Sequence, residues 1–89
     1  MNSEQALAQA CQNKLQVIIN YTKKTTGEFV THTCGIQEIN GNLIWGWDIS
    51  LQDHIRKFLL ENIQSIEVLN IPYIVTNGYP IKINGAIVG

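Results

Sequence analysis

The chain has 89 residues, enough for one domain with a single modest hydrophobic core. Hydrophobic residues make up 45% and charged residues only 15%, which argues against disorder and predicts some apolar surface that contacts a partner. The net charge of −1 gives no overall attraction to nucleic acid or anionic lipid, although a local basic patch stays open. No stretch matches a signal peptide or a membrane span, so we expect a cytoplasmic protein with no membrane partner.

A short helix is predicted near the N-terminus, from Glu4 to Asn13, with Ser3 as its cap. Its apolar stripe of Leu7, Ala10 and Cys11 is narrow and consists of small side chains. Such a helix can lie flat on a sheet or cover the end of a barrel, so we expect a structural role for it.

Five β-strands are predicted after the helix, because the apolar residues change from a helical to an alternating pattern. Gly35, inside the second strand, predicts a bend or bulge that lets one long strand serve both sides of a small barrel. Asn40-Gly41 predicts a tight hairpin to the third strand, and residues 61–64 predict a single tight turn before the fifth. The strands are expected at residues 15–21, 28–39, 43–49, 55–60 and 65–71.

These elements predict a mainly β fold, a small five-stranded antiparallel barrel with an N-terminal α-helix and a C-terminal β-hairpin. A barrel is favoured because an open five-stranded sheet would leave one apolar face in water. Residues 1–71 are expected to form the barrel with its helix, and residues 72–89 a hairpin that extends the same domain. The hairpin, turning at Asn77-Gly78, belongs at an edge because Pro72 and Pro80 donate no ladder hydrogen bonds. The expected core consists of Val17, Ile19, Val30, Ile36, Trp45, Phe58, Ile66 and Val68.

Catalytic and metal sites are not predicted. His32 and Cys34 share a strand face, but zinc needs three or four ligands, and residues two apart on a strand rarely reach hydrogen-bond contact as base and nucleophile. Cys11 and Cys34 are expected to be buried thiols rather than a disulfide. We therefore predict a protein that is not an enzyme and that needs no metal or cofactor.

Several segments, read in order, match the pattern of a known family. They are V-I-I-N-Y at 17–21, T-T-G-E at 25–28, T-C-G-I at 33–36, N-G-N-L-I-W-G-W-D at 40–48 and I-R-K-F-L-L-E-N-I-Q-S-I-E-V-L at 55–69. Together they resemble the WYL domain, an Sm-like small barrel found mainly as the effector-sensing part of bacterial transcriptional regulators and in proteins tied to phage defence. The most specific part is Arg56-x-Phe58 followed by Ile63 and Ile66-Glu67-Val68. The naming triad is replaced by Asn-Leu-Ile at 42–44.

The resemblance implies a freestanding, divergent regulatory or adaptor module that senses a small nucleotide-like ligand or nucleic acid and acts in transcriptional regulation or phage defence. Arg56 carries over as a ligand contact, His32 as a polar residue in the strand that leads to the Gly-Ile pair, and Asn62 as a position where the family's second arginine is missing. The family's DNA-binding winged helix has no counterpart in this sequence, so regulation would need a partner protein.

Other interpretations stay open for these residues. Trp47, like Trp45, is either part of the core or a platform on which a base or flat ligand stacks. Arg56 either contacts a ligand or pairs with Asp48 or Glu61. If it contacts a ligand, Arg56→Ala is expected to abolish binding and leave the fold intact.

Two further hypotheses compete with the sensor. An oligomeric protein–protein interaction module without a ligand is the main alternative, and its apolar C-terminal segment predicts a homo-oligomer. An Sm-like RNA-binding ring is disfavoured by the net charge. The expected partners are thus a second copy, a small anionic ligand or single-stranded nucleic acid, or another protein.

Overall fold

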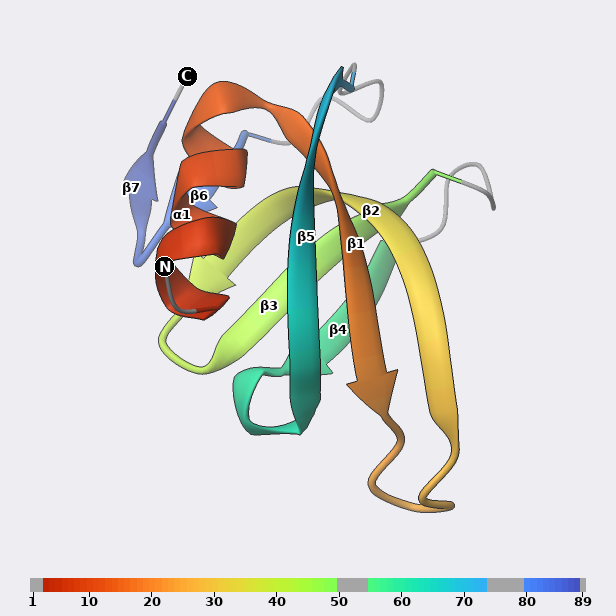
Figure 1. Ribbon diagram of the computed structural model, residues 1–89. Coiled ribbons are helices and arrows are strands. Elements are labelled where there is room, and N and C mark those ends of the chain that lie inside the picture. Colours follow the sequence, from red (N-terminus) through yellow and green to blue (C-terminus); the bar gives the residue numbers. More distant parts are fainter. Residues whose placement is uncertain (1–2, 50–54, 74–79, 89) are drawn as a thin grey trace.

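The computed structural model describes residues 3–49, 55–73 and 80–88 (Figure 1). A helix, α1, precedes the strands, and a short 3-10 helix, η1, separates two of them. The elements are α1 (Ser3–Asn13), β1 (Leu15–Thr22), β2 (Phe29–Asn40), β3 (Leu43–Asp48), β4 (Ile55–Leu59), η1 (Leu60–Asn62), β5 (Ile63–Pro72), β6 (Lys82–Ile83) and β7 (Ala86–Ile87).

Five antiparallel strands form the main sheet, in the order β4-β3-β2-β1-β5. The 12-residue strand β2 holds the two halves together, because residues 29–35 pair with β1 and residues 34–40 pair with β3. Figure 1 shows β2 arching across the molecule. The mainly β architecture, with a helix first and a hairpin last, is confirmed. No ladder joins β4 to β5 among the described strands, so closure of the predicted barrel is not observed.

Two local features lie at the bend of β2. A Cβ atom on Gly35 would lie between 2.5 and 2.7 Å from ring atoms of Tyr73, so only glycine allows this ring to lie on the strand. The Tyr73 hydroxyl donates a hydrogen bond to the carbonyl oxygen of Ile36. The pairing with β3 then shifts between Ile36 and Glu38, which makes Gln37 the extra residue of a β-bulge. A bulge in this part of β2 was expected and is confirmed.

The β2–β3 hairpin turns one residue later than expected. Asn40 pairs directly with Leu43, so Gly41 and Asn42 are the central residues of the turn. Gly41 has a φ of 61°, and glycine at the first central position is typical of a type II′ turn, whose twist suits two-residue hairpins.

The C-terminal hairpin consists of β6 and β7, which turn at Asn84 and Gly85 with φ values of 50° and 86°. The predicted turn at Asn77-Gly78 lies outside the described residues. Strand β6 pairs in parallel with Glu38 and Ile39 of β2, beyond the point where β1 leaves that strand. The Asn84 amide also donates to the Ile39 carbonyl at 2.6 Å, so the hairpin is tied to the sheet.

Helix α1 packs against β5, β2 and β1, as expected for a structural lid. Its buried residues are Ala6, Leu7, Ala10 and Cys11. Cys11 is a free buried thiol, and so is Cys34, as predicted. Within the described ranges, no helix has the length and apolar character needed to cross a membrane.

The core differs from the prediction mainly at β3. Its buried face carries Ile44, Gly46 and Asp48, whereas Trp45 is half-buried on the other face. Val30 is also half-buried, because it lies near the exposed end of β2. The core cluster contains Leu7, Ala10, Cys11, Val17, Ile19, Cys34, Ile36, Ile44, Phe58, Ile63, Tyr73 and Ile81, with Ile66 and Val68 packed against it.

Candidate ligand-binding site

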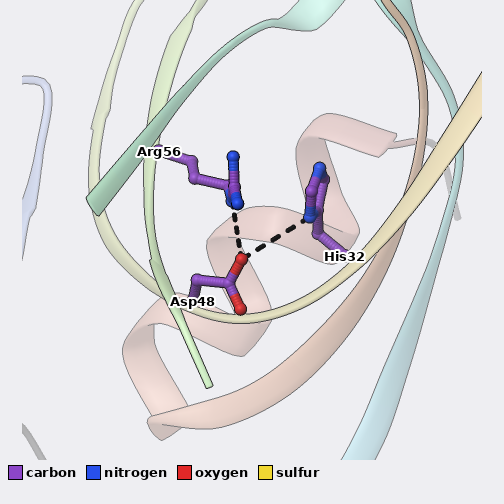
Figure 2. A network of polar contacts seen from close by, with 3 residues as sticks. All are labelled: His32, Asp48 and Arg56. Carbon is purple, nitrogen blue, oxygen red and sulfur yellow. Dashed lines mark hydrogen bonds and ion pairs between the residues drawn. The ribbon is translucent and has the colours of Figure 1, made fainter. Parts of the chain in front are cut away.

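A buried carboxylate connects three neighbouring strands. Asp48 ends β3, its side chain is 1% exposed, and β3 lies between β2 and β4. Arg56 of β4 donates from Nε to Oδ2 of Asp48 at 2.6 Å, and Nδ1 of His32, from β2, lies 3.5 Å from the same oxygen. Figure 2 shows both side chains directed at the same carboxylate oxygen. Because a buried charge needs a partner, Asp48 fixes the position of the Arg56 guanidinium.

His32 is the weaker partner of Asp48. Burial lowers the pKa of His32 below its ordinary 6.5, and the positive charge of Arg56 lowers it further, while Asp48 opposes both effects. The imidazole is therefore largely neutral at pH 7. Arg56 supplies the counter-charge of Asp48, which is the structural pairing that the sequence left open.

A surface hollow of about 320 Å³ lies beside this group, and we call it the cationic hollow. Lys23, His32, Arg56 and Lys57 supply basic groups, and the Phe58 ring meets Tyr21 edge-on with centroids 5.1 Å apart. The described residues that line it are Tyr21, Lys23, Val30, His32, Ile55, Arg56, Lys57 and Phe58. A ligand here would meet four nitrogen-bearing side chains and aromatic walls.

The basic side chains differ in how firmly they are held. Lys23 lies 3.6 Å from Glu28 in an exposed ion pair, which contributes little stability and leaves the lysine free to reorient. Arg56 is 29% exposed, and its recorded bond to a described residue uses Nε, so the two terminal nitrogens remain for a ligand. Lys57 is exposed. The hollow thus combines one fixed cation with two adjustable ones.

The four residues predicted to contact a ligand do not all gather at this hollow. His32 and Arg56 both line it. Trp47 is not among its described lining residues, because it alternates with buried Gly46 and Asp48 and so lies on the other face of β3. Asn62 lies in η1, also outside the lining, and its buried Nδ2 has no hydrogen-bond partner among the described residues.

Sequence reasoning missed three contributors to the hollow. Lys57, Lys23 and Tyr21 were not among the predicted ligand contacts. Lys57 follows Arg56 directly in sequence, but alternation along β4 assigns the two to opposite faces, and the approach of Tyr21 and Lys23 depends on how β1 and β4 lie in the bent sheet. No local sequence signal shows that approach.

A second surface hollow of about 350 Å³ lies between α1, β3 and β6. Its described lining is mostly aliphatic, with Leu7, Ile39, Ile44 and Leu60 among its walls, and Glu4 is the charged residue there. Ligand sites usually add a few convergent polar groups to an apolar wall. The cationic hollow fits that description better, although it is slightly smaller.

Comparisons with known proteins identify the fold. No family model matches the chain, and no curated protein matches it. Among solved structures, proteasome accessory factor B/C (PafBC) of Arthrobacter aurescens matches with a TM-score of 0.70 and 17% sequence identity. The match covers 85% of this chain and 13% of the PafBC chain, so this chain spans only a small part of that protein's length. At this identity the likeness establishes a shared fold.

Proposed function

We propose that the protein is a non-catalytic, WYL-like regulatory module whose cationic hollow senses a small nucleotide-like anion or single-stranded nucleic acid, in transcriptional regulation or phage defence. PafBC contains WYL domains, so the structural match agrees with the resemblance carried by the sequence. The observation that carries the proposal is the convergence of Lys23, His32, Arg56 and Lys57 on one hollow in a protein of net charge −1.

The chemistry of the hollow suits a phosphate. A guanidinium forms paired hydrogen bonds with phosphate oxygens, and Asp48 already holds that of Arg56 in place, so less side-chain freedom is lost on binding. Lys23 and Lys57 are flexible point charges that can follow a phosphate. An anion bound beside His32 would also favour its protonated form by opposing the lowering of its pKa, so binding should be accompanied by proton uptake.

A catalytic role has less support. Burial raises the pKa of the Cys34 thiol to about 12, with the nearby Asp48 charge as a smaller cause, and burial raises that of Cys11 to about 11. Both thiols are therefore protonated at neutral pH and are poor nucleophiles. No group of three or more His, Cys, Asp or Glu side chains in the described parts of the chain is arranged to hold a metal ion.

The test compares two lysines of equal charge. Lys57 lines the hollow, whereas Lys24 is exposed in the β1–β2 turn and is not among the described lining residues. We expect Lys57→Ala to weaken binding of a fluorescent oligothymidylate and to reduce the salt dependence of its affinity by about one phosphate contact. Lys24→Ala should change neither quantity. Equal effects of the two substitutions, or no binding by the unmodified protein, would overturn the proposal.

The assembly module remains a second candidate because apolar residues are exposed near the sheet edges. Ile71 of β5 is 51% exposed and Ile87 of β7 is 70% exposed. Edge strands with exposed apolar side chains favour pairing with another chain. If the protein self-associates there, Ile87→Lys should lower the mass measured by light scattering, and Thr25→Lys, at an exposed position in the β1–β2 turn, should not. An unchanged mass for both variants would remove this candidate.

Truncating the C-terminal segment would be a poorer test of assembly. Deletion of residues 79–89 would remove Ile81, which is 5% exposed and belongs to the core, together with the β6 pairing to β2. A loss of mass would then be confused with a loss of fold.

A further inference from the structure

A smaller hollow of about 160 Å³ lies on the outer side of the sheet, and we call it the tryptophan slot. The half-buried Trp45, which the sequence analysis assigned to the core, forms one wall of this slot. The described lining residues are Gln37, Glu38, Trp45, Ile55, Pro80 and Lys82. An aromatic wall beside an amide, a carboxylate and an ammonium group is the type of lining that holds a flat, polar ring.

Strand pairing explains how these groups come together. Trp45 of β3 is paired with Lys57 of β4 on one side and with Glu38 of β2 on the other, and Glu38 is paired with Lys82 of β6. These four residues form one row across the sheet. No ion pair that uses Glu38, Lys57 or Lys82 is recorded with any residue of the described ranges, so their charges are available beside the indole.

The bulge in β2 contributes the amide of the slot. Gln37 is the extra residue of that bulge and is 5% exposed, which is unusual for a glutamine. A β-bulge redirects the side chains around it. Here it places a buried amide beside the indole wall instead of in solvent.

The tryptophan slot adjoins the cationic hollow. Ile55 lines both hollows, and Lys57, which lines the cationic hollow, stands directly opposite Trp45. Side chains that face each other across antiparallel strands have Cβ atoms about 4.5–5.5 Å apart. A ring stacked on Trp45 and a phosphate beside Lys57 therefore lie within the reach of one nucleotide.

We propose that the tryptophan slot takes the base of a nucleotide whose phosphate lies in the cationic hollow, so that the module senses a nucleotide unit rather than an inorganic anion. The inference rests on the proposed function for the phosphate and adds the base. Trp45 supplies the stacking face, and the carboxylate of Glu38 and the ammonium group of Lys82 supply an acceptor and donors to the edge of the base. Stacking of one base on an aromatic side chain corresponds to a gain in affinity of about 5- to 150-fold.

Calorimetric titration with two probes tests the base separately from the phosphate. Adenosine 5′-monophosphate should bind about 5- to 150-fold more tightly than ribose 5-phosphate, which lacks the base. Trp45→Ala should remove that difference and leave the affinity for ribose 5-phosphate unchanged. Trp47→Ala is the matched control, because Trp47 lies on the same face of β3 but outside the described lining of the slot, and it should retain the difference.

A second measurement keeps the inference testable if Trp45→Ala does not fold. The chain has two tryptophans, so Trp47→Phe leaves Trp45 as the single reporter, and its fluorescence should change with the monophosphate and not with ribose 5-phosphate. If both probes bind equally and Lys57→Ala weakens both, the slot inference is wrong and the proposed function stands. If neither probe nor the oligothymidylate binds, both are wrong.

Discussion

Arg56→Ala should destabilise the fold, because it removes the ion-pair partner of a fully buried carboxylate. Breaking a buried ion pair typically costs about 3–5 kcal/mol, since one charge is left uncompensated. Arg56 is 29% exposed, so water reaches part of the pair, and His32 at 3.5 Å offers Asp48 a second contact. We therefore expect a loss of about 2–4 kcal/mol in the free energy of unfolding.

Urea denaturation at pH 7.5 measures this loss as a lower midpoint with an unchanged slope. Making the same substitution in an Asp48→Asn variant shows whether the loss of stability comes from the buried charge. Asp48→Asn removes that charge while keeping the shape of the side chain. In that background Arg56→Ala should cost about 1 kcal/mol or less, which gives a coupling energy of about 1–3 kcal/mol between the two positions. Lys57→Ala, next in sequence and exposed, should stay within about 0.5 kcal/mol of the unmodified protein.

The reasoning fails if Arg56→Ala costs less than about 1 kcal/mol, or if its cost is the same with and without the Asp48 charge. The result also decides how ligand binding should be tested. The sequence led to the expectation that Arg56→Ala leaves the fold intact, but the buried pair with Asp48 makes this substitution unsuitable as a pure binding variant. Lys57→Ala removes a charge from the same hollow and leaves the ion pair between Asp48 and Arg56 in place.

Three other substitutions probe the same core. The pKa of His32 is lowered from 6.5 in the folded chain, so the unfolded chain takes up the proton first as the pH falls. The stability contribution of His32 should therefore be fully present above about pH 6.5 and decline below it. Urea midpoints compared between about pH 5 and 8 should show this decline in the unmodified protein and not in His32→Gln. Gly35→Ala should cost at least about 1–3 kcal/mol, since its Cβ would overlap the Tyr73 ring, and an unchanged midpoint would show that the ring moves freely. Phe58→Ala should cost about 3–5 kcal/mol, because the ring is 2% exposed and packs on Tyr21, and a loss below about 1 kcal/mol would contradict its place in the core.

The sequence was sufficient to predict the helix and the five longer strands, because strand alternation and turn residues are local signals. The α1 helix, the five strands and the turn at η1 all fall within a few residues of their expected positions. Burial in β3 was not predictable in the same way, since both faces of that strand carry apolar residues. The alternation shows that Trp45 and Asp48 lie on opposite faces, but hydrophobicity favours burying the tryptophan.

The burial of Asp48 depends on partners that other strands supply. Arg56 and His32 come from β4 and β2, and their arrival beside Asp48 helps to make a buried carboxylate tolerable. The requirement for Gly35 is similar: its small size is visible in the sequence, but the Tyr73 ring that needs the space comes from a residue far along the chain. Sites built from such long-range contacts are beyond the reach of periodicity.

The choice of which face of β3 is buried links the structural and functional features of the sheet. The inner face of β3 carries Asp48 next but one to Gly46. Asp48 accepts a hydrogen bond from Arg56 and so holds the guanidinium at the rim of the cationic hollow. The same alternation turns Trp45 outward, where strand pairing sets it opposite Lys57. The fixed cation Arg56, the exposed cation Lys57 and the half-buried indole of Trp45 thereby lie near the start of β4. A fully apolar inner face would bury the indole and leave Arg56 without its anchor, so the buried acid and the outward tryptophan are two consequences of one choice of face.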